Sequence, residues 1–98
     1  MDVIVRIVIR GRVQGVGFRA WTEMTAVEQR LEGWVRNRRD GSVEALFAGA
    51  EEVVLTMIDL CRAGPSGARV AAIDQLDAGS ADLALRRPGQ PFSVLATV

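Results

Sequence analysis

The residues best suited to chemistry lie in one short glycine-rich segment, Gly11 to Arg19, whose sequence is GRVQGVGFR. It follows a stretch with strand character and precedes one with helical character, which predicts a loop that leads into a helix N-terminus. Glycines allow successive backbone N–H groups to converge, and a helix N-terminus adds partial positive charge, so this loop could bind an anion. Arg19 could complete the site with a two-pronged grip on phosphate oxygens. On these residues alone, a tight turn with a solvated arginine carries the same weight.

The residue types that are absent narrow the chemistry further. The chain has no histidine and no tyrosine, and all twelve of its basic residues are arginine. This excludes a histidine general base, a Schiff-base lysine, a phosphohistidine intermediate and every zinc site that uses histidine. The single cysteine, Cys61, cannot form an internal disulfide, and we expect neither a metal nor a cofactor. The glycine spacing differs from G-x-G-x-x-G and a Walker loop needs lysine, so no nucleotide loop is indicated.

Charge and the N-terminal stretch bear on partners and location. Twelve basic and twelve acidic residues cancel, which gives no support for a protein that coats nucleic acid. The first residues, MDVIVRIVIR, are interrupted by Asp2 and two arginines, which argues against a signal peptide and against a membrane span. We therefore expect a cytoplasmic protein with no membrane partner, and a monomer by default.

Strand and helix patterns alternate along the chain and predict the elements that hold the loop. β-branched alternation predicts a strand over 3–10, and Asp40-Gly41 predicts a hairpin turn. The other expected elements are helices over 18–31 and 50–62, strands over 34–39, 42–48 and 68–76, a long loop or weak edge excursion over 77–91, and a short last strand over 92–98. The order β-α-β-β-α-β predicts an α+β sandwich with two helices on one face of a mainly antiparallel sheet. Without a repeat or linker, residues 1–98 are expected to form one domain.

The expected helices also predict which side chains are buried. Apolar residues recur at helical spacing in both, at Ala20, Met24, Val27 and Leu31 in the first and at Val54, Met57, Ile58 and Cys61 in the second. Cys61 on such a face is expected to be a buried structural thiol. Trp21 and Trp34 are expected to pack in the core, and Arg36, Arg38 and Arg39 to lie along a solvated strand edge.

Two segments together resemble one protein family. Gly11 to Arg19 is similar to the acylphosphatase signature G-x-V-Q-G-V-x-F-R, with each specified position present. Gly33 to Glu44, GWVRNRRDGSVE, resembles the second signature of that family, G-W-V-x-N-x-x-D-G-x-V-E, again in full. The resemblance extends more loosely from residue 3 to residue 76, and the order and spacing of the two segments also fit.

The resemblance implies a ferredoxin-like fold and hydrolysis of acyl phosphates to a carboxylate and inorganic phosphate. It implies that Arg19 is a catalytic, phosphate-binding residue and that Asn37 is a catalytic residue that orients the attacking water. The implied phosphate site is completed by the backbone amides of Gln14, Gly15, Val16, Gly17 and Phe18, with no metal. Carbamoyl phosphate, acetyl phosphate and 1,3-bisphosphoglycerate all fit as substrates, because the motif recognises the phosphate rather than the acyl group.

Some positions depart from the family pattern, and two rival functions stay open. A glycine-leucine pair usually ends the first helix, whereas Arg30 precedes Leu31 here, and the C-terminal stretch lacks the arginine or tyrosine of many members. One rival is a catalytically weak anion-binding or regulatory module of the same fold. The other is an RNA-binding ferredoxin-like domain, which is disfavoured because the chain has only five aromatic residues for base stacking.

Overall fold

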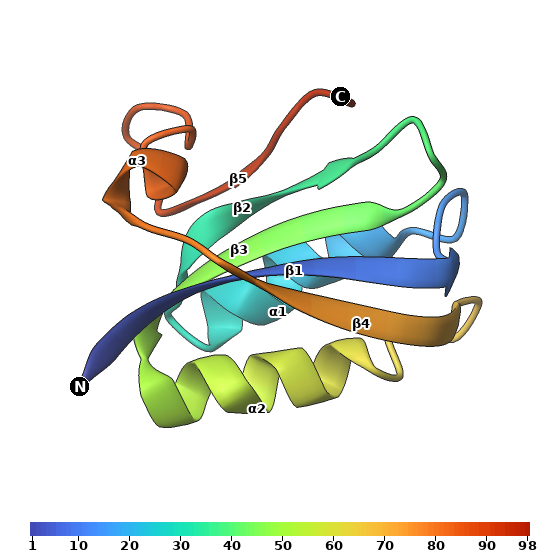
Figure 1. Cartoon of the computed structure of the whole chain (residues 1–98), viewed down its shortest axis with the longest axis horizontal. Coiled ribbons are helices and arrows are strands. Elements are labelled where there is room, and N and C mark those ends of the chain that lie inside the picture. The colour runs from blue at the N-terminus through green and yellow to red at the C-terminus, as the bar shows by residue number, and fades with distance from the viewer.

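One five-stranded sheet with two long helices on one face forms the body of the molecule, as Figure 1 shows. The computed structural model describes all 98 residues. The elements are β1 (Asp2–Arg12), α1 (Phe18–Glu28), β2 (Glu32–Asn37), β3 (Val43–Ala50), α2 (Glu51–Cys61), β4 (Arg69–Asp77), α3 (Ser80–Leu83) and β5 (Phe92–Val94). The strand order is β4-β1-β3-β2-β5, and only the β2–β5 pair is parallel. The α+β, ferredoxin-like prediction is therefore confirmed.

Alternation along the strands decides which side chains meet the helices. Ile7, Val35 and Phe47 are fully buried in the core between the sheet and the helices. Asn37 comes two residues after Val35 and therefore lies on the same face of the sheet. Arg36, between them, lies on the opposite face. The alternation along β2 therefore places the side chain of Asn37 on the face of the sheet that is covered by α1.

The opposite face of the sheet is partly covered by residues 77–91, which were expected to form a long loop. The short helix α3 lies in this segment, and the Trp34 indole N–H donates to the carbonyl oxygen of Asp82 at 2.8 Å. Trp34 is fully buried beneath it, as expected for a packing residue. The segment then leads into β5, which adds to the edge of β2. β5 is shorter than predicted, but the Leu95 and Val98 N–H groups continue the pairing along β2.

The prediction of a solvated edge at the arginines of β2 is wrong for Arg36. Because β5 covers β2, this strand is not an edge. The Arg36 guanidinium donates to Glu44 Oε1 at 2.7 Å and lies 4.6 Å from the centre of the Trp34 ring. Arg6 pairs with the same carboxylate at 3.0 Å, so Glu44 is buried as a charge with two partners.

The predicted apolar face of the first helix is wrong for Ala20, Met24 and Val27, which are exposed, whereas Leu31 is buried as expected. Met24 and Val27 are 56% and 52% exposed, and the helix ends at Glu28 rather than at residue 31. The buried side chains are those of Phe18, Thr22, Thr25 and Ala26. Each threonine hydroxyl donates to a backbone carbonyl one turn earlier, at 2.8 Å for Thr22 and 2.7 Å for Thr25. These bonds satisfy the polar atoms, so threonine occupies core positions where periodicity predicts apolar residues.

The predicted apolar face of the second helix is confirmed, since Val54, Met57, Ile58 and Cys61 are all buried. Burial raises the pKa of the Cys61 thiol to about 12. A thiol in this state has almost no thiolate at neutral pH and is a structural residue rather than a nucleophile.

No helix of the chain is long and apolar enough to cross a membrane.

The end of α1 stores backbone strain at Arg30, where the family pattern has glycine. Arg30 has φ 58°, in the left-handed region. Its N–H donates to the Val27 carbonyl at 3.0 Å, and the Leu31 N–H donates to the Ala26 carbonyl at 2.9 Å. These two bonds form a Schellman motif, in which the residue at the position of Arg30 is usually glycine.

We expect Arg30→Gly to stabilise the protein. The left-handed conformation costs a residue with a Cβ about 1–2 kcal/mol, and the greater freedom of glycine in the unfolded chain offsets about 0.5–1 kcal/mol of the gain. The free energy of unfolding should rise by about 0.5–1 kcal/mol and Tm by about 2–8 °C. The matched control is Arg62→Gly, because Arg62 ends α2 with φ −64° and should lose stability. A loss of stability in Arg30→Gly, or an equal gain in Arg62→Gly, would contradict this explanation.

Candidate active site

The loop between β1 and α1 has the shape that its glycines predict. Gly15 and Gly17 have φ values of 73° and 80°, and Gly17 is the residue that caps the N-terminus of α1. A Cβ at either position would meet no atom within 4 Å, so these glycines border open space rather than packed neighbours. The left-handed backbone at both positions is what favours glycine there.

The backbone N–H groups of this loop are free to bind a ligand. None of the amides from Gln14 to Arg19 donates a hydrogen bond to another group of the chain. The first turn of α1 carries no acidic residue, whereas Glu51 and Glu52 lie in the first turn of α2. The partial positive charge at the start of α1 is therefore not offset by a carboxylate of its own helix. Free amides and uncompensated charge together suit an anion.

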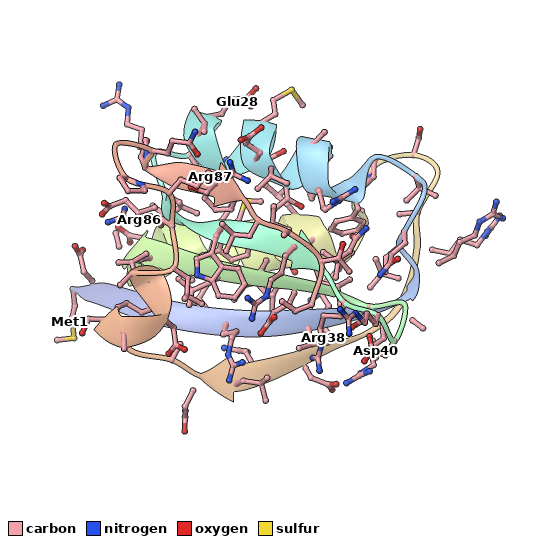
Figure 2. The ribbon with its side chains drawn as sticks, turned by 90° about the horizontal axis from the view of Figure 1, so that it is seen from above. Met1, Glu28, Arg38, Asp40, Arg86 and Arg87 are labelled. Carbon is pink, nitrogen blue, oxygen red and sulfur yellow. The ribbon has the colours of Figure 1, made fainter.

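The Gln14 side chain connects the loop to the β2–β3 hairpin. Its Nε2 donates to the Arg38 carbonyl at 2.7 Å and to the Ser42 carbonyl at 2.8 Å, which lie on the two sides of the hairpin turn. Within the turn, the Ser42 N–H donates to Asp40 Oδ1 at 2.9 Å, and the hydrogen bonds from Ser42 hold the pKa of Asp40 below its usual value. Figure 2 shows Arg38 and Asp40 side by side at this end of the molecule. The side chain of Gln14 thus fixes the loop, and its backbone amide is left for a ligand.

Gln14→Glu should destabilise the protein although the two side chains have nearly the same shape. A carboxylate has no N–H to donate, and its oxygens would meet two carbonyl oxygens. We expect the free energy of unfolding to fall by about 1–3 kcal/mol in denaturant titrations. Gln75→Glu, the same change at an exposed position of β4, is the control and should cost less than about 0.5 kcal/mol. Equal losses in both variants would contradict the role given to Gln14.

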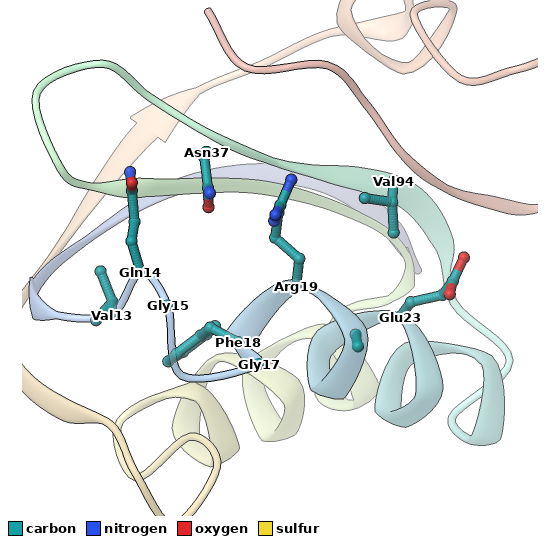
Figure 3. A pocket seen from close by; sticks show the side chains of 10 residues that line it. Val13, Gln14, Gly15, Gly17, Phe18, Arg19, Glu23, Asn37 and Val94 are labelled. Atoms are coloured by element: carbon teal, nitrogen blue, oxygen red, sulfur yellow. The ribbon is translucent and has the colours of Figure 1, made fainter.

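Arg19 and Asn37 face one cavity from opposite sides. The cavity has a volume of about 330 Å³ and includes Gln14, Gly15 and Gly17 in its lining. Arg19 extends into it from the first turn of α1, and Asn37 extends from the end of β2, as Figure 3 shows. The structure thus brings together the loop and both side chains singled out by the sequence, except that Val16 does not line the cavity.

Both of these side chains are half-buried and have no partner in the chain. The Arg19 guanidinium makes no ion pair and no hydrogen bond, although six other arginines are paired. The Asn37 amide likewise forms no hydrogen bond with the chain, so its N–H and its oxygen are both available. The backbone of Asn37 is held on both sides, by the pairing with Val43 and by the Val98 N–H at 3.2 Å. The arrangement can therefore bind an anion and hold a polar molecule beside it.

Three further side chains line the cavity that sequence reasoning did not single out. Ala20 and Glu23 come from α1, and Val94 comes from β5. Glu23 lies one helical turn after Arg19, a spacing that places both on one side of the helix and could have indicated it. Val94 had no such signal, because only the parallel pairing of β5 with β2 brings it here.

The side chains that commonly bind metal ions are not clustered in this structure. No group of three or more aspartate, glutamate or cysteine side chains lies close enough together to hold an ion.

Several known proteins that are similar to this chain in sequence and structure are named acylphosphatases. The family profile described as Acylphosphatase matches residues 5–84. A curated relative named "Acylphosphatase" from Bradyrhizobium diazoefficiens is 60% identical over 97% of this chain and 96% of its own length. Another from Rhodopseudomonas palustris, also named "Acylphosphatase", is 59% identical over the full length of both chains. The crystal structure of acylphosphatase from Bacillus subtilis has a TM-score of 0.80 and 34% identity, covering 97% of this chain and 99% of that one.

Proposed function

Because the chain belongs to the acylphosphatase family, we propose that it hydrolyses small acyl phosphates to a carboxylate and inorganic phosphate at the cavity described above. The loop amides and Arg19 bind the phosphoryl group, and Asn37 positions the attacking water. The observation that carries this assignment is one cavity in which a run of free amides, an unpartnered Arg19 and an unpartnered Asn37 meet. None of these three features is used by the fold itself.

The amides from Gln14 to Phe18 and the guanidinium of Arg19 surround the phosphoryl oxygens. They neutralise the negative charge that these oxygens carry as the reaction proceeds, and they are already in place before the substrate arrives. The left-handed backbone of Gly15 and Gly17 lets the amides converge. The arginine fork supplies two parallel donors, which fixes the orientation of the phosphoryl group as well as its position.

Asn37 acts on the water. Its amide can accept a hydrogen bond from the water through the oxygen or donate one through the N–H₂ group, and it does not ionise. The water oxygen forms a bond to phosphorus while the bond between phosphorus and the acyl oxygen breaks, and the carboxylate leaves with that electron pair. The proton of the water passes to the phosphate product or to solvent. A carboxylate is a good leaving group, so positioning accounts for most of the catalysis and no strong general acid is needed.

The domain organisation, oligomeric state, location and partners of the protein form the second part of the proposed function. We propose that residues 1–98 act as a single domain and as a monomer in the cytoplasm, without a cofactor and without nucleic acid. Half of the twelve arginines are paired with carboxylates of the chain, so only the other half are free to contact a phosphate backbone.

Turnover of benzoyl phosphate by the purified protein tests the proposed function. We expect hydrolysis in excess EDTA to match hydrolysis with added magnesium, because arginine and amide donors supply the charge stabilisation. The measurement is the fall in benzoyl phosphate absorbance with and without each addition. Activity that disappears in chelator and returns with a divalent ion would overturn the metal-free mechanism. Phosphate binding without any turnover would instead support an anion-binding module.

A further inference from the structure

The cavity extends beyond the part that a phosphoryl group would occupy. One end is formed by the loop, Arg19 and Asn37, and the other end by Ala20, Glu23 and Val94 (Figure 3). A methyl group and an apolar side chain form two of these three walls, so this end offers no further donors for phosphate oxygens. An acyl phosphate carries its acyl group on one phosphoryl oxygen. The second end is therefore the space left for that group.

Glu23 is the one charged residue at this end of the cavity. It follows Arg19 by four positions on α1, a spacing at which opposite charges on a helix often pair. Nevertheless its carboxylate forms no ion pair with any arginine of the chain, and it accepts no hydrogen bond. In Figure 3 the carboxylate points away from Arg19, on the side of Val94. A half-buried carboxylate without a partner thus borders the space for the acyl group.

This carboxylate does not serve the phosphoryl group, because like charges repel. Its charge acts instead on whatever charge the acyl group carries. Two unit charges about 6 Å apart change a rate or equilibrium by about threefold in water and by about a hundredfold at the effective dielectric constant near a protein surface. A half-buried carboxylate lies between these limits, so an effect of about tenfold is expected.

Taking the proposed hydrolysis of acyl phosphates as its premise, we propose that Glu23 sets the charge preference for the acyl group. It disfavours substrates whose acyl group carries a carboxylate or a second phosphate, relative to substrates with a neutral acyl group. It favours an acyl group that carries an ammonium. Among acyl phosphates of similar size, the preferred class is therefore neutral or cationic.

Three benzoyl phosphates test this proposal: the unsubstituted compound, one with a ring carboxylate and one with a ring aminomethyl group. The quantity compared is kcat/KM for each charged substrate divided by kcat/KM for the neutral one. In Glu23→Gln this ratio should rise about tenfold for the anionic substrate and fall about tenfold for the cationic one. Any effect of Glu23 on the phosphoryl group is common to all three substrates and cancels. Added salt should shrink both changes.

Glu28→Gln is the matched control. Glu28 lies on the same helix and changes the net charge equally, but it is exposed and lies at the far end of α1 from the hairpin, as Figure 2 shows. Its ratios should stay within about twofold of the wild-type values, since water and salt screen the charge of an exposed side chain. The proposal is overturned if the ratios in Glu23→Gln stay at wild-type values, if both move in the same direction, or if Glu28→Gln reproduces them. Absence of turnover with all three substrates in the wild-type protein would instead overturn the proposed function.

Discussion

Arg19→Ala should remove nearly all turnover of benzoyl phosphate and most of the affinity for inorganic phosphate. The guanidinium has no partner in the chain and extends into the cavity, so it is free to bind the phosphoryl group of the proposed substrate. Substrate, transition state and product all carry the phosphoryl oxygens that Arg19 is proposed to contact. Removing a contact made in all three states weakens binding and removes transition-state stabilisation together. We expect a loss of at least a hundredfold in kcat/KM, in the range for a removed oxyanion donor.

The affinity for phosphate can be measured without activity. A ligand that binds only the folded state raises Tm by mass action, so tens of millimolar phosphate should stabilise the wild-type protein. Arg19→Ala should lose most of this shift. Arg19→Lys should recover little of it, because an ammonium does not reproduce the two-pronged fork. Arg19 is half-buried and unpaired, so both variants should remain folded.

Arg12→Ala is the control for net charge. Arg12 lies near the start of the same loop, is exposed and forms no ion pair, so its removal changes the charge by the same amount. We expect a change of no more than about threefold in kcat/KM, and less at high salt. A normal phosphate-induced shift in Arg19→Ala, or equal losses in both variants, would show that Arg19 does not bind the phosphoryl group directly.

The loop and the hairpin were predictable because their conformations demand particular residues. Gly15 and Gly17 adopt left-handed backbone conformations, and Asp40-Gly41 forms the turn, so each leaves a local signal in the sequence. Strand alternation then places Asn37 on the same side as Val35, facing α1. The position of Arg19 was predictable because Arg19 lies in the first turn of α1, which begins directly after the loop.

The features that escaped prediction depend on contacts between distant segments. Thr22 and Thr25 occupy core positions because back-bonding satisfies their hydroxyls, which periodicity does not reveal. Residues 77–91 carry no periodic pattern, and their position is set by Trp34 and by the pairing of β5 with β2. Val94 reaches the cavity only through that pairing. The position of Val94 was therefore hidden, whereas the loop, Arg19 and Asn37 could be singled out from the sequence.

Asn37→Ala should separate catalysis from phosphate binding. The Asn37 amide lies across the cavity from Arg19 and is free of hydrogen bonds within the chain. If it holds the attacking water, its contribution is realised only as the water approaches phosphorus. We expect kcat to fall by about a hundredfold or more, and the affinity for inorganic phosphate to stay within about twofold. This pattern is the opposite of that expected for Arg19, where binding and turnover fall together.

The measurement combines steady-state kinetics on benzoyl phosphate with a phosphate titration followed by Tm. The backbone of Asn37 is held by Val43 and by the Val98 N–H, and its side chain is only half-buried, so Asn37→Ala should keep the fold of β2. Asn37→Asp is the isosteric comparison: it keeps an acceptor, loses the N–H donors and places a negative charge beside the phosphoryl group. It should therefore lose turnover and phosphate affinity together. An Asn37→Ala protein with normal kcat, or with phosphate affinity that falls as far as its activity, would show that Asn37 does not position the water.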